Sequence, residues 1–199
     1  MCQTVLAALT GSRKWMCVPA SPAGWGPSNS ACLMLSIAGG SLAAAATVVL
    51  ALLFYFSGLW KTGDGALGAL AVKTAYGKVH LDLGEAFVRA IGCNWMVCLA
   101  VWMALAARQT VSKIFAIFFP IMGFVAIGFE HCVANMYFIP VGIMLTRWAG
   151  LAPEGIDVTT ITWGAFFLKN LVPVTIGNTI GGVVFVGLGY WGAYLRPSR

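Results

Sequence analysis

The sequence predicts an all-α integral membrane protein, built as a polytopic helical bundle. Of its 199 residues, 60% are hydrophobic and only 9% are charged, and the mean hydropathy is +0.87. A chain of this length cannot hide so many apolar side chains in a water-soluble core, whereas a bilayer accepts them. Long uncharged stretches alternate with short charged ones, which predicts a transmembrane domain over residues 30–199.

The net charge and the cysteine spacings argue against nucleic-acid binding and against a disulfide framework. The formal net charge is +6, and no basic run with interleaved aromatic residues occurs, so nucleic acid is not an expected partner. The cysteines lack paired spacings, and those in predicted spans are interpreted as small apolar residues rather than disulfides. We expect a protein that is not an enzyme and that needs no cofactor. The cysteines are Cys2, Cys17, Cys32, Cys93, Cys98 and Cys132.

The N-terminal third of the chain contains one predicted span. Residues 1–29 are rich in Pro, Gly, Ser and Trp and receive no assigned structure. The first span is expected at about residues 30–60, because this stretch is uncharged and ends in FYFSGLW, whose aromatic residues suit the membrane interface. Residues 61–82 mix both charges with glycines, which predicts an aqueous or interfacial loop with a short helix around residues 67–76.

Two further unbroken spans are expected at about residues 84–107 and 166–195. The first of them contains Asn94 and leads into the short turn ARQTVSK, which carries Arg108 and Lys113 and no acid. A short, purely basic loop is typical of the cytoplasmic side of a membrane. A second mixed-charge loop precedes the last span.

The remaining span, at about residues 113–146, is expected to be broken near residues 128–135. As one straight helix, the run from Ile114 to Thr146 would be about 50 Å long, too long for a hydrocarbon core of about 30 Å and too short for two crossings. Backbone that leaves a helix inside a membrane must be buried in protein or line a wet cavity, so the break predicts a pore. The proposed helix breakers are Pro120, Gly123, Gly128, Pro140 and Gly142.

Glu130 and His131 sit side by side in this otherwise uncharged run. Ionisable groups inside a membrane are costly and usually functional. We therefore interpret His131 as a pore residue that donates a hydrogen bond, or a proton, to a small carboxylate. The alternative is a neutral histidine bonded to a backbone carbonyl. Asn94 either bridges two helices or lines the pore.

Three ordered segments resemble the formate/nitrite transporter family. They are AIGCNWMVCLAVWM (90–103), GFEHCVANMYFIPVGI (128–143) and NLVPVTIGNTIGGVVFVGLGYWGAYLR (170–196), with AYGKVHLDLGEAF (75–87) in the same register. The resemblance implies an aquaporin-like inverted-repeat fold and a homopentamer with one pore in each protomer. It covers roughly residues 39–197, corresponding to the last four of the family's six helices. We expect either a fragment, which we favour, or a protein that lacks the family's first two transmembrane helices and half of its gate.

The resemblance also implies roles for single residues. It places His131 and Asn94 in the pore and Lys78 at an outer vestibule, where a positive charge would concentrate anions. It assigns Phe124 and Val97 to an apolar constriction that excludes hydrated ions, with ordinary core packing as the alternative.

Other polar residues and glycines have predicted structural roles. Glu130, Asn135 and Gly128 are expected to hold the helix break, the two polar side chains by satisfying freed peptide groups. A further set is interpreted as packing residues: Gly177, Asn178, Gly181 and Gly182.

The leading functional prediction is a channel or transporter for small monovalent anions in a multi-pass protein of the plasma or inner membrane, with an organellar membrane as the alternative. Formate is the first candidate, then nitrite, with lactate and hydrosulfide behind, and proton coupling stays open. The expected partners are these anions, protons, the lipid bilayer and further copies of the chain.

Two other functions compete with this prediction. The first is a membrane-embedded metal or redox site built from His131, Cys132, Cys93 and Cys98, although the five-residue spacing of the last two does not stack them on one helical face. The second is a neutral-solute channel of the aquaporin kind, which lacks a paired Asn-Pro-Ala box here.

Overall fold

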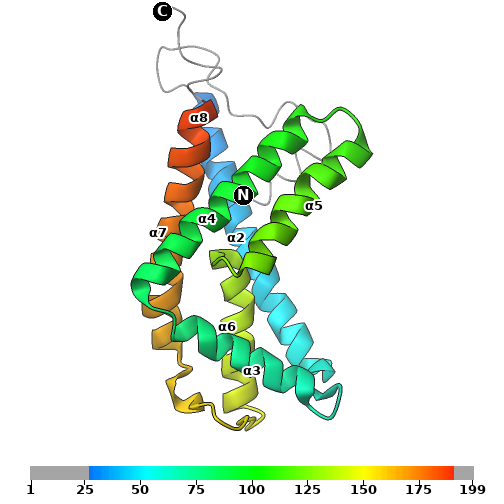
Figure 1. Ribbon diagram of the computed structural model, residues 1–199, viewed down its shortest axis with the longest axis vertical. Coiled ribbons are helices and arrows are strands. Elements are labelled where there is room, and N and C mark those ends of the chain that lie inside the picture. Colours follow the sequence, from blue (N-terminus) through cyan, green and yellow to red (C-terminus); the bar gives the residue numbers. More distant parts are fainter. Residues whose placement is uncertain (1–26, 191–199) are drawn as a thin grey trace, which may run out of the picture.

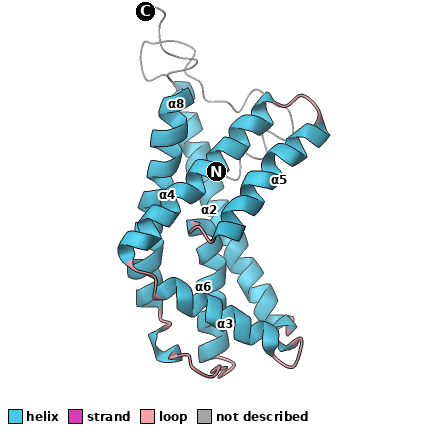
Figure 2. Ribbon diagram, in the orientation of Figure 1, coloured by secondary structure: helices cyan, strands magenta, loops and turns pink. Residues whose placement is uncertain are grey.

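The structure, a computed structural model, describes residues 27–190, with side chains from Leu42 to Gly189. The segment at residues 1–26 and the end of the last predicted span lie outside the described residues. Within them, every regular element is a helix (Figures 1 and 2). Three helices are long and apolar enough to cross a membrane: Leu83–Ala106, Thr110–Ile127 and Ala165–Gly187. The predicted all-α membrane fold is therefore confirmed.

Helix α2 (Pro27–Phe56) leads through the short turn η2 (Leu59–Lys61) into α3 (Ala66–Val79). Helix α3 confirms the short helix expected in the mixed-charge stretch, and it extends beyond the predicted end. Lys78 consequently lies in the last turn of a helix, not in a loop. The reason is that Val72, Ala75 and Val79 recur at helical spacing and bury one face of α3 in the core cluster that includes residues of α6.

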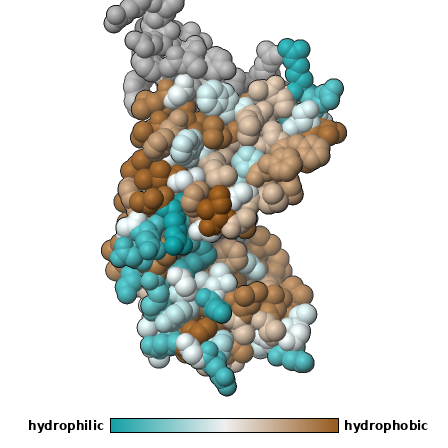
Figure 3. Space-filling model, viewed as in Figure 1, coloured by the Kyte–Doolittle hydropathy of each residue, from teal (hydrophilic) through white to brown (hydrophobic). Residues whose placement is uncertain are grey.

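Helices α4 (Leu83–Ala106) and α5 (Thr110–Ile127) form an antiparallel pair (Figure 1). Asp82 caps α4 by accepting a hydrogen bond from the Gly84 N–H at 2.8 Å. One face of α4 is buried, whereas only 6% of α5 is buried within the chain. Figure 3 shows the resulting surface, which is largely apolar over α5 and hydrophilic near the junction of α3 and α4.

The helix is interrupted between α5 and α6 (Cys132–Arg147). Gly128 ends α5 with φ 81°, a left-handed conformation that costs glycine little. The other proposed breakers do not break the chain here: Pro120 and Pro140 lie inside α5 and α6. A proline removes only one backbone hydrogen bond, which a membrane helix tolerates when neighbours compensate.

The last long helix consists of four segments that follow one another without a break: η4 (Ala165–Leu171), α7 (Val172–Ile180), η5 (Gly181–Gly187) and α8 (Leu188–Tyr190). The segments η4 and η5 have wider, π-helical turns. A short 3₁₀ turn, η3 (Val158–Thr160), precedes this helix. Helix α7 lies against α4, where a Cβ added at Gly177 or Gly181 would collide with α4 backbone. These two glycines therefore permit close helix packing.

Candidate functional site

The candidate site is the helix break between α5 and α6, and His131 organises it. The His131 Nδ1 accepts a hydrogen bond from the Ala134 N–H at 3.3 Å and so caps α6. Because an N–H can only donate, Nδ1 must be unprotonated, and the neutral ring then carries its proton on Nε2. The Phe124 ring stacks on the imidazole with centroids 5.8 Å apart.

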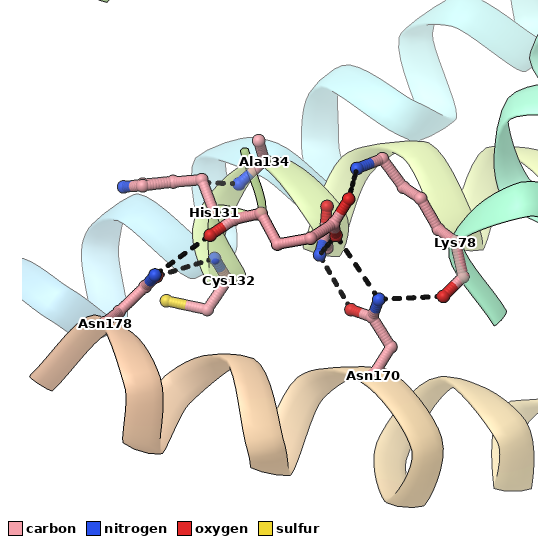
Figure 4. A network of polar contacts seen from close by, with 8 residues as sticks. Lys78, His131, Cys132, Ala134, Asn170 and Asn178 are labelled. Atoms are coloured by element: carbon pink, nitrogen blue, oxygen red, sulfur yellow. Dashed lines mark hydrogen bonds and ion pairs between the residues drawn. The ribbon is translucent and has the colours of Figure 1, made fainter. Parts of the chain in front are cut away.

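Asn178, on α7, satisfies the peptide groups on both sides of His131 (Figure 4). Its Nδ2 donates to the carbonyls of Glu130 at 2.9 Å and Ala90 at 2.8 Å, and its Oδ1 accepts from the Cys132 N–H at 3.0 Å. The side chain is 2% exposed. One buried amide thus connects the break with α4.

A second network surrounds the buried carboxylate of Glu130, which is 4% exposed. Its Oε1 accepts from the Lys78 Nζ at 2.8 Å, and its Oε2 accepts from Asn135 Nδ2 at 2.6 Å and Asn170 Nδ2 at 3.4 Å. Asn170 also donates to the Lys78 carbonyl at 3.0 Å. A buried ion pair requires such additional hydrogen bonds to offset its desolvation.

These contacts differ from the predicted ones. Glu130 and Asn135 were expected to satisfy freed peptide groups, but among the described residues their side chains bond to other side chains. Asn178, interpreted from sequence as a packing residue, bonds to the freed peptide groups instead. Asn170 had no predicted role. One feature of the sequence could have identified Asn170 and Asn178. Both lie in an apolar span, where a polar side chain without a hydrogen-bond partner costs free energy.

Asn94, Val97 and Phe124 lie beside the break. Asn94 is 1% exposed, and its Nδ2 donates to the Asn178 carbonyl at 2.6 Å. Its Oδ1 has no protein partner among the described residues. Val97 and Phe124 are buried in one apolar cluster with Cys93. The structure therefore brings the predicted constriction residues together next to His131.

The alternative metal or redox centre has no matching geometry in the described part of the chain. Among the side chains that the structure describes, residues 42–189, no three His, Cys, Asp or Glu come close enough together to hold a metal ion. The thiols of Cys93, Cys98 and Cys132 are free.

Comparison with known proteins identifies the family of this chain. A sequence model described as the formate/nitrite transporter matches residues 21–192. The chain belongs to the formate/nitrite transporter family. Over 133 residues it is 50% identical to a probable formate transporter of Methanothermobacter thermautotrophicus, covering 66% of this chain and 43% of that protein. It is 44% identical over 155 residues to the formate channel FocA of Escherichia coli K12, covering 74% and 54%.

Family membership and the apolar helices establish an integral, multi-pass membrane protein from a family of channels and transporters. The chain spans about half the length of the curated relatives that it matches.

Solved structures agree with this family. The chain is similar to a pentameric formate channel with formate bound, with a TM-score of 0.75 and 30% identity over 96% of this chain and 79% of that one. An FNT family ion channel matches with a TM-score of 0.63 and 33% identity over 85% and 61%. These matches confirm the predicted fold class.

Proposed function

We propose that the protein forms a membrane pore for small monovalent anions, with formate as the first candidate substrate and nitrite as the second. Lactate and hydrosulfide are weaker candidates. The named activities of the relatives support formate, since two of them are a formate channel and a probable formate transporter. In the proposed assembly, a homopentamer, every protomer has its own pore.

The observation that carries this proposal is the state of His131. With Nδ1 engaged by the Ala134 N–H, the ring offers its Nε2–H as a donor, and no other residue drawn in Figure 4 bonds to that nitrogen. The ring also stands at the N-terminus of α6, where the helix dipole favours negative charge. A formate carboxylate at the break would accept a hydrogen bond from Nε2–H.

The same geometry defines what proton coupling would require. A neutral imidazole can donate a hydrogen bond to formate, but to give up a proton it must first hold two. The second proton would sit on Nδ1 and would break the bond from Ala134. A proton-coupled cycle would therefore alternate between a neutral ring that caps α6 and an imidazolium that does not.

The residues around His131 have further roles in the proposed pore. Phe124 and Val97 form an apolar constriction in which a hydrated anion loses its water at high cost, whereas a neutral acid does not. Asn94 lines the pore with its unpartnered oxygen. Lys78 reaches the break from the last turn of α3 with its side chain 16% exposed, and its pairing with Glu130 reduces the field that it presents to an anion.

Flux in proteoliposomes tests the proposal, and the chain offers a matched control because its other histidine, His80, is exposed at the end of α3. We expect the wild-type chain and His80→Phe to pass formate and not glycerol. His131→Phe should lower formate flux by at least about tenfold, on the order of one hydrogen bond to a charged group. Unchanged flux in His131→Phe would remove this residue from the mechanism, and no formate flux in the wild type would reject the channel.

A further inference from the structure

An apolar groove runs between α2, α6 and η4, apart from the helix break. Its volume is about 440 Å³, and its lining includes Ala44, Ala45 and Ala51 of α2, Pro140 and Met144 of α6, and Phe167 of η4. The small alanine side chains leave room that larger residues would fill. A volume of this size is within the usual range for ligand clefts, roughly 300–1,000 Å³. It suits a slender ligand better than a helix, which is about 10 Å wide with its side chains.

One end of the groove is framed by two tryptophans and an arginine. Trp148 and Trp163 line both the groove and an adjoining hollow of about 300 Å³, which Arg147 also lines. The Arg147 guanidinium donates to the Thr159 carbonyl at 3.5 Å, and it forms no ion pair with any residue that the structure describes. The nearby carboxylate of Asp157 accepts hydrogen bonds from Thr159. An anion-binding charge is thus available at this end.

The length of α6 places that end at the membrane surface. Helix α6 has 16 residues, so Arg147 lies about 24 Å along it from the break at roughly 1.5 Å per residue. Because α5 has a similar length of 18 residues on the other side, the break lies near mid-membrane. Half of the hydrocarbon core is about 15 Å. Arg147, Trp148 and Trp163 therefore reach the headgroup level, where Trp and Arg are favourable.

We propose that this groove binds one acyl chain of an anionic phospholipid, whose phosphate lies against the Arg147 guanidinium between Trp148 and Trp163. The apolar lining matches the chain, and the unpaired positive charge at the headgroup level matches the phosphate. This lipid site does not depend on the proposed transport of formate.

Quenching by brominated lipids tests the site. The full chain is reconstituted with phosphatidylglycerol or phosphatidylcholine that carries the same brominated acyl chains, and tryptophan fluorescence is recorded. We expect phosphatidylglycerol to quench at about fivefold lower mole fraction, the factor that corresponds to roughly 1 kcal/mol for one basic residue near the surface. Equal quenching by the two lipids would overturn the proposal.

Two sets of variants locate the effect. Arg147→Gln should abolish the preference for phosphatidylglycerol, whereas Arg147→Lys and Arg108→Gln, in the loop between α4 and α5, should keep it. Ala45→Phe should fill the groove and lower the number of lipids retained in native mass spectrometry, whereas Ala46→Phe is the control because Ala46 is exposed and does not line the groove. A preference that survives in Arg147→Gln, or cross-linking of Ala45→Cys to a second copy of the chain, would overturn the lipid site.

Discussion

At the helix break, the side chain of Asn178 forms hydrogen bonds with peptide groups that have left the helix. In a soluble protein, water would satisfy such groups. The Asn178 amide accepts from the Cys132 N–H and donates to the carbonyls of Glu130 and Ala90. Water is absent from a bilayer core, where each unsatisfied peptide group costs several kcal/mol. A single buried amide therefore allows the chain to leave the helix around His131.

We predict that Asn178→Ala is strongly destabilising. The variant leaves the Glu130 carbonyl and the Cys132 N–H without partners, at about 1–3 kcal/mol each, and removes a second hydrogen bond from the helical Ala90 carbonyl, so the free energy of unfolding should fall by at least about 2 kcal/mol. For a chain of this size that lowers Tm by roughly 4–8 °C, measurable by thermal unfolding in detergent. Thr179→Ala is the matched control, since Thr179 is exposed and bonds only within its own helix. A wild-type Tm for Asn178→Ala would mean that other groups satisfy the break.

At this scale the sequence identifies the important residues but not their partners. Glu130 and His131 stand out because they are ionisable in an uncharged run. Lys78, which pairs with Glu130, is 52 positions away, and Asn170 is 40 positions away on the opposite side. Nothing in a single sequence encodes those distances. The π-helical turns around Asn170 also shift the helical phase from which its direction would be calculated.

Among the elements, conformational preferences were easier to predict than helix packing. Hydropathy located the long helices, and the short helix expected around residues 67–76 is present as α3, but its last turn, which carries Lys78, was assigned to a loop. Two prolines suggested breaks where helices continue, because the tertiary structure decides whether a missing hydrogen bond is tolerated. The glycines of the last helix were read as packing residues, and their contacts with α4 agree with that reading.

We predict that Gly181→Ala destabilises the packing of the last helix on α4. The new Cβ would overlap the Ile91 carbonyl, a backbone atom that cannot rotate away, so we expect a loss of about 1–3 kcal/mol. The measurement is the unfolding midpoint in a denaturing detergent titration. Gly189→Ala provides the comparison, because a Cβ there meets no atom within 4 Å and should leave the midpoint unchanged or raise it. Equal midpoints for the two variants would contradict close packing at Gly181.

At the scale of the whole molecule, two of the loops between helices lie at opposite ends (Figure 1). The turn between α4 and α5, with Arg108 and the neighbouring Lys113, is at one end, and the loop from Trp148 to Gly164 is at the other. The first loop is short and basic, whereas the second contains Glu154 and Asp157. The positive-inside rule then orients the molecule.

We predict that the turn between α4 and α5 is cytoplasmic. Single cysteines are introduced at Gln109 or at Glu154, in a background whose native cysteines are replaced by alanine. A membrane-impermeant maleimide should label Glu154→Cys in intact cells and Gln109→Cys only after permeabilisation. The reverse labelling pattern would show that the molecule is inserted the other way round.

The ion pair between Lys78 and Glu130 has a consequence for how the chain is made. During synthesis Lys78 emerges before Glu130, but Asn170, which shares the same carboxylate, emerges later. A carboxylate that meets lipid without its partners costs at least about 2.5 kcal/mol. Until the last helix has been synthesised, the Glu130 carboxylate therefore lacks the hydrogen bond from Asn170. The nascent chain differs from the finished protein in this interaction. The order of translation thus makes the final helix the step that completes the hydrogen bonds of the Glu130 carboxylate.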